Sequence, residues 1–499
     1  MKRKPFPLAD PEQVGISSQD ILDYIDALEA SDTEMHGLMI MRHGMICCQG
    51  WWAPYGPGLR HGLQSHTKTY AATAVGIACR EGLLRLDEPV LDIFPEFAPE
   101  PPSDKLKRLK VRDVLCMGCG MDTMPAPSKD WIREFLHTPV VHEPGTTYMY
   151  NSFGSTLLGA MVRQRSGLGL HDYLKPRLFD KLGIDSDNLR WVRLPDGMEV
   201  GGGGLFATTE DNLRLMKLYL DGGVWAGERI LSEEYVRLAT TNQNDSATES
   251  LHNPLATDNF LGYGFQIWMC KPHGAYRADG AMGQFTIVLP EQDMIIAINE
   301  TAAGAGPQQH TLDLTWDFVS RITSAAPLPP DPVGSERLAR RLKRLNIGNP
   351  DSAPISPAAS EVSGRLYRVL SGSFGPFGGN FMSGELPDPI SSFRLDFDGD
   401  GCLWSFATQG GKKESVRVGM RGERFNNLVG KPEDPTREYL CSGIWTAERE
   451  FRLTCRFAES CVEDRYTMRF DGKTVHIQAE NNSAFRGPEP LYIAAVQVE

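Results

Sequence analysis

The sequence lacks the features that would place it in a membrane or nucleic-acid-binding class. No apolar run reaches the roughly 18 residues that a membrane-spanning helix needs. The basic N-terminal stretch MKRK is not followed by the apolar core of a signal peptide. Basic residues are outnumbered, with 51 Lys and Arg against 64 Asp and Glu, so a nucleic-acid-binding face is not expected. These absences predict a cytoplasmic protein that binds neither membranes nor nucleic acid.

The cysteines also lack a regular spacing pattern. The ten cysteines of the 499-residue chain stand singly or in unevenly spaced pairs, which predicts reduced thiols rather than a disulfide framework. Cys116 and Cys119 have C-x-x-C spacing, so a redox role is one alternative, but the sequence around them has no βαβ pattern and no second cysteine pair. Neither a phosphate-binding loop nor a G-x-S-x-G elbow occurs. We therefore expect no cofactor and no metal.

The pattern of strands and helices predicts an α+β fold for the first two thirds of the chain. Residues 17–30 have helical periodicity, and residues 36–52 resemble a β-hairpin with its turn at His43-Gly44. Strand patterns return over residues 261–299, and a helix is predicted for residues 308–322. Because both ends supply strands and a helix, we expect one antiparallel sheet flanked by helices, with a helical insertion between them.

Composition shifts divide the chain into three parts. Residues 1–325 form the α+β domain, and residues 326–360 are rich in Pro and Ser, as an interdomain linker would be. Residues 361–499 contain many short alternating segments. One of them, RYTMRFDGKTVHIQ, predicts a hairpin with a two-residue Asp471-Gly472 turn. We expect an all-β antiparallel barrel there, lipocalin-like in character.

The stretch QSHTK, residues 64–68, is the strongest candidate for chemistry. Ser65 and Lys68 are three residues apart at the start of a helical pattern, so the two side chains share one face. A buried lysine with a lowered pKa can act as the base for a serine nucleophile. A serine that caps a helix, followed by a solvated lysine, is the common alternative for such spacing.

The wider sequence resembles the serine β-lactamase and penicillin-binding-protein superfamily, best in its class C-like branch, which includes esterases and D-aminopeptidases. The resemblance covers about residues 10–325 in the family's order. Five segments carry it: HGLQSHTKTYAATAVGIACREGLLRLDEPV, LKVRDVLCMGCGMDT, HEPGTTYMYNSFGSTLLGAMV, GGGGLFATTEDNLRLMKLYLDGGVWAGERILSEEYV and GAYRADGAMGQFTIVLPEQDMIIAIN. Together the five segments are specific, whereas no single one is.

The resemblance implies a role for each matched residue. Ser65 would be the nucleophile that forms an acyl-enzyme, with Lys68 as its base. Tyr150 would relay a proton to the leaving group, its pKa held down by the positive charge of Lys68. The backbone N–H groups of Ser65 and Ala281 would form the oxyanion hole.

Two motifs depart from the family's pattern at the substrate-binding positions. The family's Y-x-N motif ends here in Ser152, although the neighbouring Asn151 is an alternative. The cationic residue of the third motif is replaced by Ala278, which is followed by Asp279 and Gly280. In β-lactamases that cation holds the substrate carboxylate, so its loss argues against anionic substrates. Gly280 would let the substrate backbone approach the strand.

The sequence therefore predicts a serine hydrolase acting on a small-molecule ester or amide. A D-amino-acid amidase or peptidase, or a weak β-lactamase, would use the same mechanism, and a non-catalytic scaffold that keeps the fold is a further alternative. The C-terminal barrel resembles accessory domains of D-aminopeptidase-like members. Whether it restricts substrate size or supports a homodimer is left open by the sequence.

Overall fold

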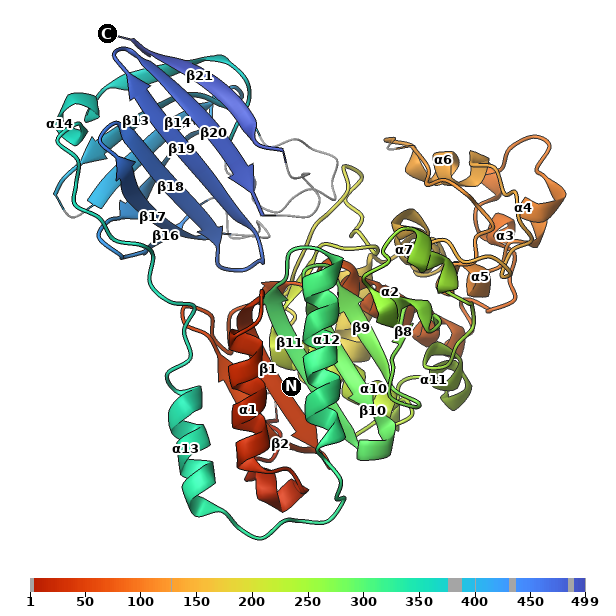
Figure 1. The fold of residues 1–499 in the computed structure, drawn as a ribbon. Helices are drawn as coiled ribbons and strands as arrows, with labels where there is room; N and C mark the ends of the chain where they lie inside the picture. Colours follow the sequence, from red (N-terminus) through yellow and green to blue (C-terminus); the bar gives the residue numbers. More distant parts are fainter. Residues whose placement is uncertain are drawn as a thin grey trace. The chain divides into compact units, whose positions relative to one another are not determined.

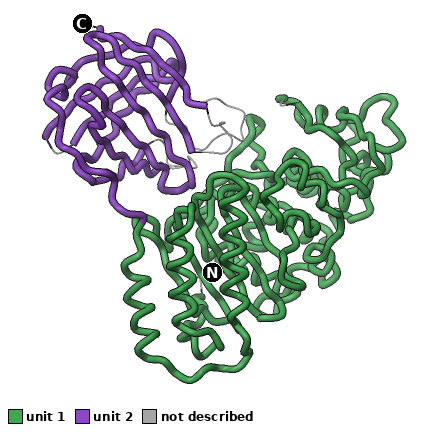
Figure 2. The backbone as a smooth tube through the Cα atoms, viewed as in Figure 1, with its two compact units in different colours: residues 1–346 green, residues 347–499 purple. Residues whose placement is uncertain are grey.

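The chain divides into two compact units, residues 1–346 and residues 347–499 (Figure 2). The computed structural model describes residues 4–126, 128–375, 388–399, 401–429, 437–482 and 489–498. The segment expected to be a linker contributes to both units. Its helix α13 (Pro332–Leu342) packs along α1 (Ser18–Glu29), and Arg341 forms ion pairs with Asp26 and Glu29 of that helix.

A six-stranded antiparallel sheet is the centre of the first unit, as the sequence predicted. Its order, β2-β1-β11-β10-β9-β8, joins the two ends of the unit, because β1 pairs with β11. Side chains along each strand point alternately to the two faces of the sheet. Because both faces are buried, the strands are nearly continuously apolar. Their bounds are Glu34–Arg42 (β1), Met45–Trp51 (β2), Trp268–Met269 (β8), Tyr276–Gly280 (β9), Gln284–Leu289 (β10) and Met294–Thr301 (β11).

Helices cover both faces of this sheet. On one face α1 and α12 (Ala305–Ser320) lie side by side (Figure 1) and pack through the stacked rings of Tyr24 and Phe318. On the other face α10 (Thr209–Leu220) crosses β1, β10 and β11. These two layers confirm the predicted arrangement of a sheet flanked by helices.

The predicted helical insertion lies between β2 and β8. Its core is the pair α2 (Thr67–Arg80) and α7 (Ser152–Ser166), which pack against each other. Small residues on α2 allow close approach: an added Cβ at Gly76 would lie 2.6 Å from the Tyr235 ring. The other helices of the insertion are α3 (Val90–Ile93), α4 (Asp104–Arg108), α5 (Val111–Leu115), α6 (Trp131–His137), α8 (Leu170–Leu174), α9 (Asp180–Leu182) and α11 (Glu233–Ala239). Its short strands are β3 (His61–Gly62), β4 (Arg190–Trp191), β5 (Leu205–Ala207), β6 (Val224–Trp225) and β7 (Glu228–Arg229).

The second unit is the predicted antiparallel barrel. Within its described residues, nine strands close into a ring through a bridge between Gly419 of β15 and Ser442 of β17, while β16 extends from β17. The strands are β12 (Leu366–Ser371), β13 (Ile390–Phe397), β14 (Gly401–Thr408), β15 (Lys413–Gly419), β16 (Phe425–Leu428), β17 (Glu438–Ala447), β18 (Glu450–Phe457), β19 (Glu463–Asp471), β20 (Thr474–Asn481) and β21 (Leu491–Val498). The short helix α14 (Ala359–Val362) precedes them.

Alternating apolar residues fill the barrel. In β18 every second residue is buried, and the predicted hairpin of β19 and β20 places Met468 opposite Ile477 and Phe470 opposite Val475. Trp404 of β14 is completely buried among these side chains. The alternation that predicted a barrel is therefore the inside–outside alternation of its wall.

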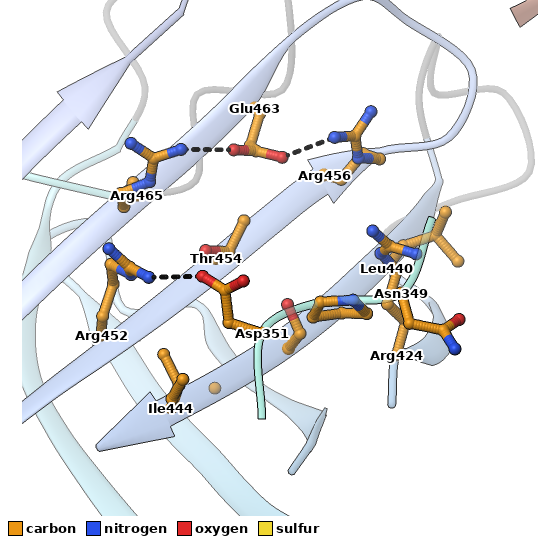
Figure 3. A pocket seen from close by; sticks show the side chains of 13 residues that line it. Asn349, Asp351, Arg424, Leu440, Ile444, Arg452, Thr454, Arg456, Glu463 and Arg465 are labelled. Atoms are coloured by element: carbon orange, nitrogen blue, oxygen red, sulfur yellow. Dashed lines mark hydrogen bonds and ion pairs between the residues drawn. The ribbon is translucent and has the colours of Figure 1, made fainter. Parts of the chain in front are cut away.

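The outer face of β17, β18 and β19 carries a cavity of about 310 Å³ (Figure 3). Several of its charged side chains are paired within the lining: Arg452 lies 3.3 Å from Asp351, and Glu463 lies 2.9 Å from Arg456 and 3.2 Å from Arg465. Because carboxylates of the protein face these arginines, much of the positive charge of the cavity is neutralised internally.

Candidate active site

Ser65 lies in a 3₁₀ turn, residues 64–66, immediately before α2. The sequence pattern placed it at the start of the α-helix itself, so the local structure differs from the expectation. The consequence for the side chains is small, because a 3₁₀ turn has three residues per turn and still aligns Ser65 with Lys68. Ser65 is partly exposed, whereas Lys68 is only 1% exposed.

Lys68 is positioned to act on the Ser65 hydroxyl. Its Nζ atom lies 2.9 Å from Ser65 Oγ and 4.9 Å from the centroid of the Tyr150 ring, and it donates a hydrogen bond to the Gly202 carbonyl oxygen. Burial lowers the pKa of Lys68 to about 7, against the opposing effect of the negative charge of Asp279. A large share of Lys68 is thus the neutral amine at neutral pH, the form that can accept a serine proton.

The Gly202 carbonyl is a part of the site that the sequence analysis missed. An added Cβ at Gly202 would lie 2.3 Å from the Ser152 carbonyl oxygen, and one at Gly201 would lie 2.7 Å from that of Ser155. The chain therefore passes close to α7, where side chains would not fit. The run of four glycines at residues 201–204 was the available signal, since such runs mark close backbone approach.

Tyr150 completes the group around Ser65. Its phenol forms a hydrogen bond with Ser65, and its ring stacks on Trp268 with centroids 5.9 Å apart and an interplanar angle of 16°. The expectation that Lys68 lowers the Tyr150 pKa is wrong: burial raises it, the Ser65 hydrogen bond opposes that rise, and Asp279 adds to it. Tyr150 therefore keeps its proton at neutral pH and is suited to donate it.

Gly280, the last residue of β9, allows this strand to approach the segment that carries Ser65 closely. An added Cβ at Gly280 would lie 2.0 Å from the Leu63 carbonyl oxygen and 3.1 Å from the His66 nitrogen. The backbone of Ala281, the second expected oxyanion donor, follows directly. Close approach of these two backbone segments is what an oxyanion hole shared by Ser65 and Ala281 requires.

Gly280→Ala is expected to lower kcat by about 100-fold or more, because the new methyl group would push β9 away from the Ser65 turn and displace the N–H groups expected to form the oxyanion hole. Gly58→Ala is the matched control, since nothing lies within 4 Å of a Cβ at Gly58. Ester hydrolysis by both variants and their thermal unfolding are the measurements. Equal kcat for G280A and wild type would show that the approach of β9 is not needed for the reaction.

Asp279 brings a negative charge to this site together with an arginine that is already engaged. Arg277 Nε donates to Asp279 Oδ2 at 2.7 Å, and other Arg277 nitrogens donate to Asn259 Oδ1 and to the Met269 carbonyl oxygen. The Arg277 side chain is 1% exposed. Ala278 packs in the main core of the first unit. The position where the family carries a cation is thus apolar, and Arg277 does not replace that cation.

The structure does not bring Asn151 into contact with Ser65 or Lys68 among the described hydrogen bonds. Its side-chain oxygen accepts a hydrogen bond from Gly154 N at 3.0 Å and thereby caps α7, while its nitrogen points to the sulfur of Met121. Ser152 is the first residue of α7 and is partly exposed. Of these two residues, Ser152 is therefore the one whose side chain is not used in capping the helix.

Cys116 and Cys119 have an environment unlike that of a redox centre. Both thiols are buried, and burial raises the pKa of Cys116 to about 12 and that of Cys119 further. Thiol–disulfide exchange needs an accessible thiolate. The buried thiols therefore argue against the redox alternative.

The family of the chain follows from a comparison with protein-family models. The Beta-lactamase model matches residues 25–317, which include every residue of the site described above. The chain belongs to the beta-lactamase family. Among the described residues, no helix has the length and apolar character needed to cross a membrane.

Curated relatives of this beta-lactamase family member carry hydrolase names. It is 26% identical over 326 residues to the 6-aminohexanoate-dimer hydrolase of Paenarthrobacter ureafaciens, a match that covers 59% of this chain and 79% of the relative. It is 25% identical over 253 residues to an Escherichia coli K12 protein described as a "Putative D-alanyl-D-alanine carboxypeptidase". That match covers 39% of this chain and spans only 58% of the relative's length.

Solved structures share the fold of the beta-lactamase domain. A Bacillus anthracis protein described as a "Putative 6-aminohexanoate-dimer hydrolase" superposes with a TM-score of 0.50 at 16% identity, over 64% of this chain and 87% of that chain. A Bacteroides dorei protein described as a "putative beta-lactamase" has a TM-score of 0.50 at 18% identity, over 60% of this chain and 98% of that chain.

Proposed function

We propose that the protein is a serine hydrolase that cleaves small esters or amides through an acyl-enzyme on Ser65. The observation that carries the proposal is the 2.9 Å contact between Ser65 Oγ and the Nζ of buried Lys68. Burial supplies the neutral amine that activation of a serine requires, with the pKa of Lys68 lowered to about 7. Relatives with hydrolase names, including a 6-aminohexanoate-dimer hydrolase, support the same chemistry.

The acylation step assigns one proton transfer to each partner of Ser65. Neutral Lys68 accepts the Ser65 proton as Oγ attacks the substrate carbonyl, and the oxyanion receives hydrogen bonds from the Ser65 and Ala281 N–H groups. Tyr150, protonated and hydrogen-bonded to Ser65, donates its proton to the leaving alcohol or amine and regains one from Lys68. Water then attacks the acyl-enzyme, with the proton transfers reversed, and releases the acid.

The charges around the site favour neutral or cationic substrates. Asp279 is the carboxylate whose negative charge affects both Lys68 and Tyr150. Its partner Arg277 is buried and bonded to the protein on several nitrogens. A substrate carboxylate at this position would therefore gain no ion pair from Arg277, because that cation is already engaged by Asp279. This argues for esters and uncharged or amine-bearing amides over β-lactams and peptides with a carboxylate at this end.

Three p-nitrophenyl esters with acyl chains of equal length test this preference. We expect kcat/KM for the anionic adipate monoester to be at least about tenfold lower than for the neutral hexanoate, because like charges repel across a site of low dielectric. The cationic 6-aminohexanoate ester should be hydrolysed at least as well as the hexanoate. Raising the salt concentration should reduce the difference in kcat/KM between the anionic and the neutral ester, because salt screens the repulsion. Faster hydrolysis of the anionic ester would contradict the proposed substrate class, and no hydrolysis of any of the three would count against the hydrolase itself.

A further inference from the structure

Glu300, near the end of β11, is a buried acid that the proposed mechanism does not use. Its side chain is completely buried and lies against the turn of residues 281–283, which joins β9 to β10. An added Cβ at Gly283 would lie 2.0 Å from Glu300 Oε1 and 2.2 Å from Glu300 Cγ. The carboxyl group therefore occupies the space that a side chain at Gly283 would need, directly behind the turn that begins with Ala281.

The same turn is tied to β11 by several hydrogen bonds. Gln284 Nε2 donates to the Met282 carbonyl oxygen at 3.0 Å and to the Glu300 carbonyl oxygen at 2.7 Å, and Ala302 N donates to the Met282 carbonyl oxygen at 3.1 Å. Met282 itself has φ +65°, a left-handed conformation that is costly for a residue with a side chain. The position of Ala281 thus depends on a strained turn that rests on the end of β11.

In the part of the chain that the structure describes, the carboxyl of Glu300 has hydroxyl partners rather than a cationic one. Thr311 Oγ1 lies 2.9 Å and 3.0 Å from its two oxygens, and Thr33 forms a further hydrogen bond. Within the described residues no Lys, Arg or His forms an ion pair with it. Burial therefore dominates and raises the pKa of Glu300 to about 8, so its charge state changes just above neutral pH.

We propose that Glu300 is a positioning residue for the oxyanion turn: its neutral carboxyl holds residues 281–283 in place, and its ionisation releases the turn and slows the reaction. A buried carboxylate without a counter-ion gains free energy by reaching water or N–H donors. The turn is the adjacent backbone, and Gly283 presents no side chain between them. The proposal rests on the proposed function for its catalytic consequence, whereas the coupling between Glu300 and the turn does not.

Tyr24 and His36 are other titratable groups near Glu300. Tyr24 of α1 faces it, and burial, together with the charge of Glu300, raises the Tyr24 pKa, so that this phenol stays neutral over the range concerned. On β1, Met35 is opposite Glu300, and the neighbouring His36 lies 3.4 Å from Thr301.

His36 is also hydrogen-bonded, at 3.1 Å to Glu34 and at 2.9 Å to His61. Among the described residues of α12 and of the loop before β1, the hydroxyls of Thr311 and Thr33 are the groups that reach the carboxyl. These groups are unchanged in a Glu300→Gln variant, so a transition that disappears in that variant belongs to Glu300.

Hydrogen–deuterium exchange of the peptide spanning residues 278–286 in the full-length protein tests the coupling without relying on catalysis. Between pH 7 and 9.5 we expect wild-type protection, corrected for intrinsic exchange, to fall by about fivefold or more, while Glu300→Gln stays constant. Glu12→Gln, which removes another buried carboxyl, should behave like wild type. Protection that does not change with pH in wild type, or that changes equally in Glu300→Gln, would overturn the proposal.

Ester hydrolysis over the same pH range tests the consequence for catalysis. Wild-type kcat/KM should fall about tenfold between pH 8 and 9.5, and in Glu300→Gln by less than about twofold. Thr311→Val removes a donor that favours the ionised carboxyl, so it should move the exchange and activity transitions to higher pH and serves if Glu300→Gln fails to fold. If exchange protection of the turn depends on pH but the protein has no esterase activity, the proposed function is contradicted and the coupling between Glu300 and the turn is supported. An alkaline fall that persists unchanged in both variants would overturn the catalytic role of Glu300.

Discussion

Ser65→Ala is expected to lower kcat for p-nitrophenyl acetate by about 10⁴-fold or more, because removal of the proposed nucleophile leaves only the contribution of binding and the oxyanion hole. The partly exposed Ser65 makes no packing contribution comparable to that of its buried neighbours, so thermal stability should change little. The measurement is the initial rate of hydrolysis at saturating substrate for wild type and Ser65→Ala, together with the amplitude of the burst phase.

Ser360→Ala is a suitable control for this variant because Ser360 is exposed and lies in the second unit. It should keep wild-type activity. Activity of Ser65→Ala within tenfold of wild type would mean that another group forms the covalent intermediate or that none is formed.

Lys68→Met is expected to lower kcat by about 10²- to 10⁴-fold, the contribution typical of a general base. In wild type, the pKa of Lys68 near 7 predicts that kcat/KM rises from pH 6 to pH 8 as the ammonium group loses its proton. This rise should be absent in the methionine variant, which has no group to titrate there. A persisting rise with the same midpoint would assign it to a different residue.

The same substitution should raise stability at and below neutral pH. The folded state lowers the Lys68 pKa from 10.5 to about 7, so between these values the unfolded chain binds a proton that the folded protein does not. The free energy of unfolding of the wild type therefore rises with pH across this window. At pH 7 it is lower than at pH 10.5 by an amount on the order of a few kcal/mol. The gain in Tm of Lys68→Met should shrink as the pH approaches 10.5. Such a gain would support the proposal that Lys68 is buried for function rather than for folding.

The sequence was sufficient to predict the architecture because the patterns concerned are local. The β1–β2 hairpin and the β19–β20 hairpin follow from alternating apolar residues on either side of a turn, and both occur at the predicted places. The sheet built from both ends of the first unit followed from where strand patterns occur in the chain. The barrel closure through Gly419 and Ser442 is a contact between strands distant in sequence, and no local pattern specifies it.

The candidate site was predictable only where spacing or a family motif specifies a residue. Ser65 and Lys68 are three residues apart, and their contact follows from helical geometry. The raised pKa of Tyr150 was not predictable, because it depends on how far Trp268 and neighbouring segments cover this partly buried phenol. Glu300 also gave no signal, since its position behind the oxyanion turn arises from the pairing of β10 with β11. Burial and long-range pairing decide the electrostatics of the site.

Intact-mass spectrometry after reaction with a fluorophosphonate tests the central claim most directly. We expect a single adduct on the folded wild-type protein, mapped to Ser65, slower labelling of Lys68→Met and no adduct on Ser65→Ala. Labelling should also become faster from pH 6 to pH 8, as Lys68 loses its proton. A folded wild-type protein that forms no adduct, or an adduct that persists in Ser65→Ala, would contradict the assignment of Ser65 as the nucleophile of a serine hydrolase.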